Sequence, residues 1–376
     1  MGCAGPRGHT TPDFAAVEPF GLGPFSMRRR HAQNDTTRRR EVAARAKLTP
    51  VSDSLATSVL AGDRKALAQA ITLVESRRSQ DQTVAAALLQ RLLPHTGNAI
   101  RVGVTGAPGV GKSTLIDALG CLLCDRGRKV AVLAVDPSSS VSGGSILGDK
   151  TRMSELSRRE GAFVRPSPGG ETLGGVAART REAMVCCEAA GYDVVLVETI
   201  GTGQSETAVA TMVDLFLLLL SPAAGDELQG IKRGVMELAD LILVHKADGD
   251  LAPAANRAAQ QCHAALRVLH SGEAETPAVL VGSSTTGAGL ADLWSAIESR
   301  VAEMRRNGRL QQKRALQARA WLDATVQDEL RHDFEHHPAV QAELTRLRDA
   351  VASGSSLPHA AAQRLLAIWR SAGSRG

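Results

Sequence analysis

The stretch Gly106–Ser113 reads GAPGVGKS and fits the pattern G-x-x-x-x-G-K-[ST] in full. An apolar segment, Arg101–Thr105, precedes it, and a helical pattern through Leu115, Ile116 and Leu119 follows it. The pattern is typical of a phosphate-binding loop when a strand comes before it and a helix comes after it. Both elements are predicted here, so the sequence indicates a P-loop nucleoside triphosphatase.

The residues of this loop supply the chemistry that phosphate needs. Glycines let backbone N–H groups approach phosphate oxygens closely, and the following helix adds partial positive charge at its N-terminus. Lys112 supplies a full charge at the β/γ-phosphates and is a candidate catalytic residue, and Ser113 offers a hydroxyl to Mg²⁺. The predicted nucleotide-binding residues of the loop are Gly106, Ala107, Pro108, Gly109, Val110, Gly111, Lys112, Ser113 and Thr114.

Three carboxylates are candidates for a magnesium site that also includes Ser113. Asp136 ends the strand KVAVLAVD, Asp149 follows it in GGSILGDKTRM, and Glu198 ends the strand DVVLVE. Acids at the carboxyl ends of parallel strands face the ligand crevice. Glu198-x-x-Gly201 has the shape of the GTPase element Asp-x-x-Gly, which also makes Glu198 a candidate catalytic residue. Gly201 lets its N–H approach a γ-phosphate and is a predicted switch residue.

The stretch LILVHKADGD, from Leu241 to Asp250, indicates which base is bound. Loops that read guanine usually carry Asn-Lys-x-Asp after an apolar strand. The carboxylate of Asp248 can accept from N1–H and the 2-amino group of guanine, whereas adenine would leave it buried and unpaired. Lys246 can lay its stem along the base plane. These residues favour GTP over ATP.

His245 stands where such loops usually have Asn, which ties the loop to the phosphate loop. Because His also donates and accepts hydrogen bonds, but with other geometry, we expect a looser tie. The segment Gly282–Gly287 reads GSSTTG after a further strand and is expected to offer backbone N–H groups to guanine O6. The nucleotide-binding residues predicted there are Ser283, Ser284 and Thr285, beside Lys246 and Asp248.

The apolar pattern predicts the architecture. Short strands are expected near residues 100–105, 130–135, 193–198, 215–220, 241–245 and 278–282, with helices between them. This alternation predicts an α/β fold with a mostly parallel, doubly wound sheet and helices on both faces. The expected regions are a disordered basic tail (1–50), an N-terminal helical extension (51–98), a P-loop GTPase domain (99–305) and a C-terminal helical dimerisation arm (306–376).

The extensions show helical periodicity. Asp63 is expected to cap a helix that carries Leu67, Ile71 and Val74 on one face. Towards the C-terminus, one apolar stripe recurs every four residues, and further helices begin at Pro338 and Pro358. That stripe consists of Leu322, Val326, Leu330 and Phe334. These helices are too few to form a core alone, so their stripes must pack on the main domain or on a second subunit.

Composition narrows the classes of function. The 376 residues are 43% hydrophobic, and no apolar run approaches the roughly 20 residues of a membrane span. The net charge of +5 comes from the first 50 residues, where nine Arg or Lys face four Asp or Glu. The rest of the chain is balanced, which disfavours a nucleic-acid footprint.

The six cysteines have no regular disulfide spacing, which suits a reducing compartment. Cys121-x-x-Cys124 lacks a second ligand pair, and His332 with His336 supplies too few ligands, so neither is expected to bind zinc. The Arg-rich start has no apolar core of a secretory signal. A transit peptide and a start at Met27 both stay open. The composition favours a bacterial cytosol over a mitochondrial matrix.

Together the motifs resemble P-loop GTPases that serve metal and cobalamin enzymes, most specifically the methylmalonyl-CoA mutase-associated (MeaB/ArgK-type) family. The resemblance runs from about Leu55 into the C-terminal helices. It is carried by LAGDRKALAQAITLVESR, GAPGVGKST, VDPSSSVSGGSILGDKTRM, FVRPSP, TLGGVA, YDVVLVETIGTGQSE, GDELQGIKRG and KADGD. His245, the segment 169–171 and the first 50 residues depart from the family's pattern.

The resemblance implies a GTPase that uses GTP/GDP and Mg²⁺, and a homodimer joined through helical extensions. Its implied role is a G-protein chaperone that gates adenosylcobalamin loading of an acyl-CoA mutase and protects that mutase from inactivation. It also implies a nucleotide-responsive switch in Gly225–Lys232, with Asp226, Gln229 and Lys232. From the residues alone, this segment reads equally well as a surface turn. No nucleic-acid or membrane partner is expected.

Two other functions stay open. An ATP-dependent kinase of a lysine/arginine/ornithine transport system would need ATP, and Asp248 argues against it. A nickel-type metallochaperone GTPase would need a His- or Cys-rich site, and the sequence offers none that convinces. No residue that orients the attacking water is evident, so slow turnover that a partner raises is expected. The partner mutase itself, for methylmalonyl-CoA or isobutyryl-CoA, is left open.

Overall fold

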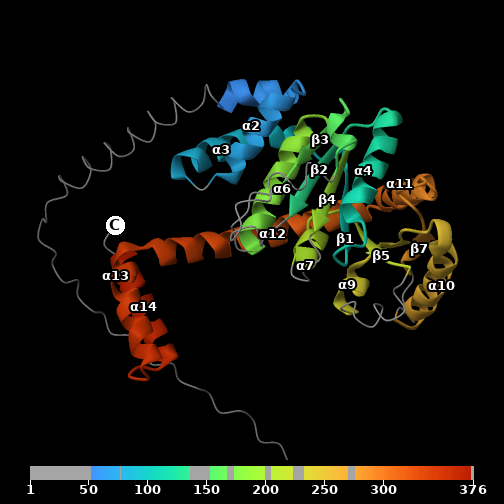
Figure 1. Ribbon diagram of the computed structural model, residues 1–376. Helices are drawn as coiled ribbons and strands as arrows, with labels where there is room; N and C mark the ends of the chain where they lie inside the picture. The colour runs from blue at the N-terminus through green and yellow to red at the C-terminus, as the bar shows by residue number, and fades with distance from the viewer. Residues whose placement is uncertain are drawn as a thin grey trace, which may run out of the picture. The chain divides into compact units, whose positions relative to one another are not determined.

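A parallel sheet lies at the centre of the computed structural model, which describes residues 52–76, 78–135, 153–166, 173–199, 205–222, 233–269 and 276–373. Within these residues the sheet has seven strands in the order β3-β2-β4-β1-β5-β6-β7 (Figure 1). Their bounds are β1 Ile100–Gly106, β2 Val130–Val135, β3 Ala162–Arg165, β4 Val194–Thr199, β5 Leu215–Leu220, β6 Leu241–Val244 and β7 Ala278–Val281. Neighbouring strands pair in parallel, which confirms the predicted fold class.

Helices cover both faces of this sheet. The N-terminal and central helices are α2 Arg64–Glu75, α3 Ser79–Leu92, α4 Lys112–Asp125, α6 Leu173–Ala189, α7 Ser205–Ala210, α9 Arg233–Leu238 and α10 Ala252–Leu269. They are followed by α11 Leu290–Arg306, α12 Arg309–His336, α13 Pro338–Ala352 and α14 Pro358–Gly373. Short 3₁₀ turns span Leu93–His95, Leu156–Arg158 and Gly249–Leu251.

Strand β5 shows how the two faces are filled. Leu217 belongs to the apolar cluster that includes α4 and α11 on one face, whereas Phe216 belongs to the cluster that includes α2, α3, α6 and α7 on the other. Leu218 belongs to a third apolar cluster with α9 and α10. Successive residues of a strand point to opposite faces, so an unbroken apolar strand buries both of its sides. Figure 1 shows α6 and α4 on opposite sides of β2 and β4.

One strand was not predicted. The sequence predicts six strands, and the structure adds β3, Ala162–Arg165, which pairs with β2 at the edge of the sheet. The strand has four residues, and only Ala162 and Phe163 are buried. A half-buried edge strand of this length leaves too short an apolar pattern to be recognised from sequence.

The N-terminal helix forms as predicted. The side chain of Asp63 accepts hydrogen bonds from the N–H groups of Lys65 at 2.7 Å and Ala66 at 3.0 Å. These backbone donors hold the pKa of the Asp63 carboxyl below its usual value. On the inner face of α2, Leu67 and Ile71 are fully buried in the cluster shared with α6. The cap and the apolar stripe predicted for this helix are therefore confirmed.

Helix α12 rests on the amino ends of β1 and β5 through polar contacts. The guanidinium of Arg314 donates to both carboxylate oxygens of the fully buried Asp214, at 2.8 and 2.7 Å. Lys313 donates to the backbone oxygen of Asp214 at 2.7 Å, and Gln317 donates to that of Val213 at 2.8 Å. Leu310 is the buried residue of this helix, and these hydrogen bonds and the ion pair add to its attachment.

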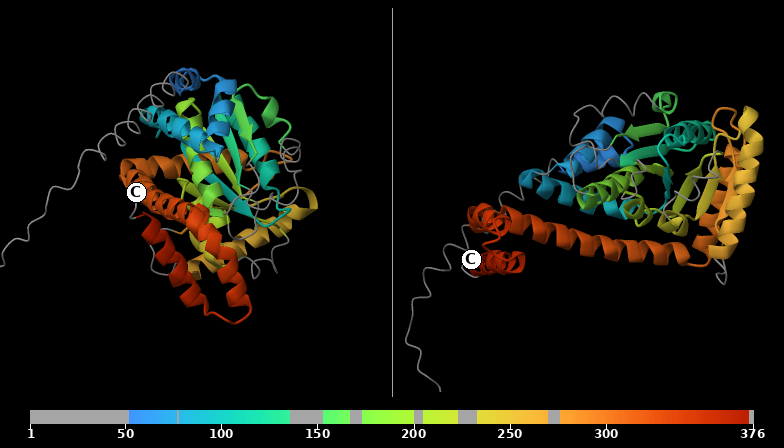
Figure 2. Two further views of the ribbon diagram at one scale, coloured as in Figure 1. Left: turned by 90° about the vertical axis from the view of Figure 1, so that its left-hand side faces the viewer. Right: turned by 60° about the horizontal axis from the view of Figure 1, so that its bottom comes forward.

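Helices α13 and α14 lie side by side after α12 and have a small apolar cluster of their own (Figure 2). The ring of Phe334, at the end of α12, meets Trp369 edge-on at 5.9 Å. The remaining stripe residues on α12, Leu322, Val326 and Leu330, are 64%, 48% and 51% exposed. They therefore do not pack on the main domain, and packing on a second subunit stays a prediction.

Residues 51–376 form one unit by their contacts, with the boundary at Pro50. The division of that unit into extension, GTPase domain and arm stays a prediction. No helix among the described residues combines the length and the apolar character needed to cross a membrane.

Candidate nucleotide site

The phosphate loop leaves the carboxyl end of β1 and enters α4 at Lys112, which is the context that the motif requires. All three of its glycines have positive φ angles, +149° at Gly106, +80° at Gly109 and +102° at Gly111. A Cβ at Gly106 would lie 2.7 Å from the backbone oxygen of Leu219 in β5. The loop therefore turns in a space that only glycine fits.

The side chain of Lys112 folds back into this loop. It is buried, and its Nζ donates to the backbone oxygens of Gly106 at 2.7 Å and Ala107 at 3.1 Å. The ammonium group is thus held inside the cradle to which the motif assigns the β/γ-phosphates.

Ser113 and Glu198 meet beside this cradle. The Ser113 hydroxyl donates to Oε1 of Glu198 at 2.6 Å. Glu198 lies near the end of β4, opposite Val104 of β1 and Ala134 of β2. A hydroxyl next to a carboxylate offers the hard oxygen ligands that Mg²⁺ prefers, so this part of the predicted metal site fits the ion.

The remaining predicted metal and switch residues lie outside the described residues. They are Asp136, Asp149, Gly201, Asp226, Gln229 and Lys232. Their roles stay predictions, and the same holds for the segment 169–171, which departs from the family's pattern.

The base loop follows β6 and turns sharply at Lys246. Lys246 has a φ of +59° and is the one non-glycine residue with a positive φ in the described part of the chain. Its Nζ donates to the backbone oxygen of Gly109 at 2.8 Å. The turn therefore places the Lys246 side chain against the phosphate loop.

Asp248 is held by a serine of the following loop. The hydroxyl of the fully buried Ser283 donates to Oδ1 of Asp248 at 2.6 Å. The same hydroxyl accepts from the N–H groups of Thr285 at 3.2 Å and Thr286 at 3.3 Å. The GSSTTG segment thus orients the carboxylate that the sequence assigns to guanine.

The backbone N–H of Ser283 does not point to the base as the sequence predicts. Its backbone N–H donates to the oxygen of Ala288 at 2.9 Å, so it is not directed at the base. The signal in the sequence was the serine itself at the start of a loop, because a serine hydroxyl often bonds to N–H groups two or three residues ahead. The predicted contacts of Ser284 and Thr285 with guanine stay predictions.

His245 lies between three loops and is buried. Its Nδ1 is 2.9 Å from the backbone oxygen of Val110, and its Nε2 is 2.6 Å from the hydroxyl of Ser284. Burial lowers the pKa of the ring, and the Val110 carbonyl and Asp248 oppose that shift only in part. The sequence predicts only a loose tie between His245 and the phosphate loop. In the structure, both ring nitrogens of His245 are instead bonded.

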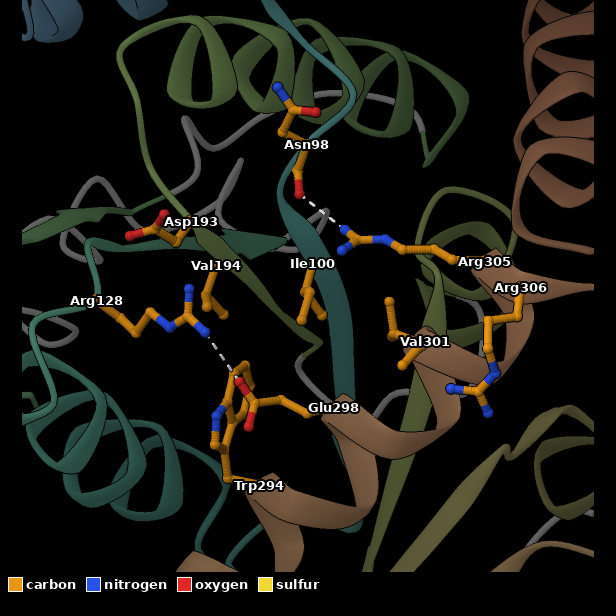
Figure 3. A pocket seen from close by; sticks show the side chains of 11 residues that line it. Asn98, Ile100, Arg128, Asp193, Val194, Trp294, Glu298, Val301, Arg305 and Arg306 are labelled. Atoms are coloured by element: carbon orange, nitrogen blue, oxygen red, sulfur yellow. Dashed lines mark hydrogen bonds and ion pairs between the residues drawn. The ribbon is translucent and has the colours of Figure 1, made fainter. Parts of the chain in front are cut away.

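A separate pocket of about 390 Å³ lies at the amino ends of the strands, whereas the phosphate loop lies at their carboxyl ends (Figure 3). Ile100 and Val194, at the amino ends of β1 and β4, line it together with residues of α11. At its rim, Arg128 pairs with Glu298 at 3.1 Å. Parallel α/β sheets bind nucleotides at the carboxyl ends of their strands, so this pocket is not the nucleotide site.

The cysteines and histidines that the sequence analysis weighed as zinc ligands lie apart from the nucleotide site. Cys121 and Cys124 are free thiols on α4, and burial raises the pKa of both. His332 and His336 are exposed, with ring centres 4.0 Å apart. Among the described residues, no group of three or more His, Cys, Asp or Glu is placed to bind a metal ion.

Comparison with known proteins shows the family of this chain. The family model described as "Methylmalonyl Co-A mutase-associated GTPase MeaB" matches residues 67–339. The GTPase ArgK of Escherichia coli (strain K12) is 51% identical over 275 residues, which are 73% of this chain and 83% of that protein. The mitochondrial methylmalonic aciduria type A homolog of Mus musculus is 45% identical over 330 residues, 85% of this chain and 80% of that protein.

The fold agrees as well. A crystal structure described as that of an "LAO/AO transport system kinase" superposes with a TM-score of 0.66 at 38% identity, covering 85% of this chain and 98% of that one. The fold is that of a P-loop nucleoside triphosphatase, and both the matched family model and ArgK are named GTPases, so the protein is a GTP hydrolase. The chain belongs to the methylmalonyl-CoA mutase-associated GTPase family.

Proposed function

We propose that this GTPase is a G-protein chaperone that gates adenosylcobalamin loading of an acyl-CoA mutase and protects the mutase from inactivation. The observation that carries the proposal is the pairing of Ser113 with Glu198 and of Ser283 with Asp248 at the candidate nucleotide site, in a chain whose matched family is described as mutase-associated. The name of the mouse relative refers to methylmalonic aciduria, which supports a mutase that handles methylmalonyl-CoA.

The proposed metal site holds Mg²⁺ between the P-loop and the ends of β2 and β4. Ser113 and Glu198 already lie 2.6 Å apart there, and Asp136 comes directly after β2 in the sequence. Asp149 completes the proposed ligands. When bound, the ion supplies charge neutralisation at the β- and γ-phosphates. The chain itself contributes the Lys112 ammonium and the loop amides.

The proposed switches follow the two strands that flank β1. Strands β4 and β5 both pair with β1, whose carboxyl end leads into the phosphate loop. The chain after β4 carries Gly201, and the chain after β5 carries Asp226, Gln229 and Lys232. Because parallel strands all end at one edge, both connections start beside the nucleotide site. This placement supports a role for them in sensing the nucleotide and signalling to the mutase.

The proposed homodimer uses the exposed stripe of α12. Leu316, at 64% exposure, is a further exposed apolar residue of the same helix as Leu322, Val326 and Leu330. Several large apolar side chains on one surface helix are typical of a protein–protein interface. A second copy of the chain, with the same stripe, is the partner that we propose.

The test is co-purification with methylmalonyl-CoA mutase and with isobutyryl-CoA mutase, each with GDP and with a non-hydrolysable GTP analogue. We expect one mutase to bind in a nucleotide-dependent manner and to accelerate GTP hydrolysis, which is slow in the isolated protein. We also expect GTP to change adenosylcobalamin loading of that mutase. No binding in any nucleotide state, with turnover of tens per second that neither mutase alters, would contradict the proposal.

The kinase alternative has one observation in its favour, because the solved structure that superposes on this chain is described as a transport-system kinase. Competition against labelled GDP separates the two functions. Displacement by ATP as effective as that by GTP favours the kinase, whereas displacement by GTP alone favours the GTPase chaperone. The nickel alternative has no comparable observation among the described residues.

A further inference from the structure

We propose that His245 is a positioning residue that orients the Val110–Gly111 peptide of the phosphate loop and joins it to the base-reading loops. The proposal rests on GTP binding and hydrolysis and does not depend on a mutase partner. It starts from a buried histidine whose two ring nitrogens bond to two different loops.

The geometry selects one form of the ring. The Val110 carbonyl can only accept a hydrogen bond, so the proton must be on Nδ1 of His245, 2.9 Å away. In the neutral ring, Nε2 then accepts from the hydroxyl of Ser284 at 2.6 Å. The charged groups nearest the ring are Lys246, which opposes protonation, and Asp248, which favours it less strongly than burial disfavours it.

The bond to Val110 fixes a peptide plane. In a trans peptide the C=O and the N–H point in opposite directions. With the Val110 oxygen turned to the His245 ring, the N–H of Gly111 is turned away from it. Gly111 directly precedes Lys112, the first residue of α4, and N–H groups at a helix start are the donors that bind phosphate. His245 thus sets the direction of one amide of the cradle.

This peptide needs such a restraint. Gly109 and Gly111, on either side of Val110, have φ angles of +80° and +102°, and glycine rotates more freely than any other residue. The ring also lies against the backbone itself, since a Cβ at Gly111 would be 2.7 Å from both Cε1 and Nδ1 of His245. The neighbouring Lys246 bonds to the oxygen of Gly109. Two consecutive residues of the base loop, His245 and Lys246, thus bond to two consecutive carbonyls of the phosphate loop.

The second ring nitrogen extends the tie to the base. Ser284 follows Ser283, whose hydroxyl holds the carboxylate of Asp248. His245 therefore contacts both the loop that orients the guanine reader and the loop that binds phosphate. Loss of the ring should weaken binding of the whole nucleotide rather than change which base is preferred.

The test compares two variants in which only the hydrogen bonds differ. His245→Met fills the space without bonding to either loop, whereas His245→Asn can donate to Val110 and accept from Ser284. We expect the Met variant to bind labelled GDP about tenfold to a hundredfold more weakly, and the Asn variant to stay within about threefold of the parent. In GTP hydrolysis, KM should rise more than kcat falls, and the preference for guanosine over xanthosine nucleotides should persist.

A second variant covers the case in which the Met protein does not fold. Ser284→Ala removes the donor to Nε2 from a half-buried position and leaves the ring in place. We expect it to weaken GDP binding by about threefold to tenfold, and not to weaken it further in a protein that already carries His245→Met. Unchanged GDP affinity in a folded Met variant, or in Ser284→Ala, overturns the proposal. An Asn variant as weak as the Met variant overturns it as well.

Discussion

The hydroxyl of Ser113 and the carboxylate of Glu198 are joined by a 2.6 Å hydrogen bond, although 85 positions separate them in the sequence. Ser113 is the second residue of α4, and Glu198 lies near the end of β4. The sheet brings them together because β1 pairs directly with β4, and the phosphate loop continues from β1. Helix α4 and strand β4 therefore each supply one potential Mg²⁺ ligand. Both ligands lie where the predicted Glu198–Gly201 switch begins.

Substitution of Glu198 should impair hydrolysis more than binding. Glu198→Gln keeps the shape of the side chain but removes its charge, so we expect the turnover of GTP to fall by about 10²-fold. We also expect a higher Mg²⁺ requirement and nearly unchanged GDP affinity without Mg²⁺. Steady-state hydrolysis over a Mg²⁺ series measures this. Glu155→Gln, at an exposed ion pair with Arg158, is the control, and full turnover in Glu198→Gln would refute the assignment.

Substitution of Arg314 should destabilise the fold. The Met variant leaves the fully buried carboxylate of Asp214 without its ion-pair partner, which typically costs about 3–5 kcal/mol. Urea unfolding of the variant measures the loss in unfolding free energy. Arg346→Met breaks the exposed pair with Glu343 and should leave the unfolding free energy nearly unchanged. Equal losses in the two variants would show that the buried pair does not anchor α12.

Sequence reasoning recovered the parts of the molecule that repeat a strong local pattern. The phosphate loop, the cap at Asp63 and six of the strands were placed because glycine spacing, a capping side chain and apolar runs are local signals. Strand β3 was missed because four half-buried residues at a sheet edge resemble a loop.

The tertiary contacts of the site were only partly foreseen. The sequence indicated that Ser113 and Glu198 would share a metal site, but nothing local pairs Ser283 with Asp248 or Arg314 with Asp214. Such contacts depend on which strand ends lie side by side. They emerge only when the order of strands in the sheet is known.

Stability should depend on pH through His245. Burial keeps its pKa in the folded chain below the value of 6.5 that applies to an unfolded chain. Above about pH 6.5 both states hold the neutral ring, so its contribution is fully present. As the pH falls further, His245 becomes protonated in the unfolded chain but stays neutral in the folded chain. The unfolding free energy therefore decreases until the pH reaches the folded pKa.

The matched variant isolates this contribution. His245→Asn does not titrate, so the difference in unfolding free energy between the parent and this variant should shift in favour of the variant as the pH falls. Urea unfolding at about pH 7.5, 6.5 and 5.5 gives the difference directly. A difference that stays constant over this range would mean that the ring titrates equally in both states.

The stripe on α12 should control the oligomeric state. Leu322→Glu combined with Leu330→Glu places two charges in the proposed interface, so we expect a monomer where the parent is a dimer. Sedimentation at several concentrations measures the change. Leu357→Glu, at a residue that is 74% exposed and lies between α13 and α14, should remain dimeric. A parent protein that is itself monomeric would refute this dimer.

The most direct test of guanine recognition is the base preference of Asp248→Asn. We expect the parent carboxylate to accept from two guanine donors, whereas the amide of the variant would donate to the 2-oxo group of xanthine. GDP binding should therefore weaken and XDP binding should strengthen. The ratio of the two dissociation constants should move by about 10²-fold or more towards XDP. A ratio that stays at the parent value would show that Asp248 does not read the base and would contradict the account of this site.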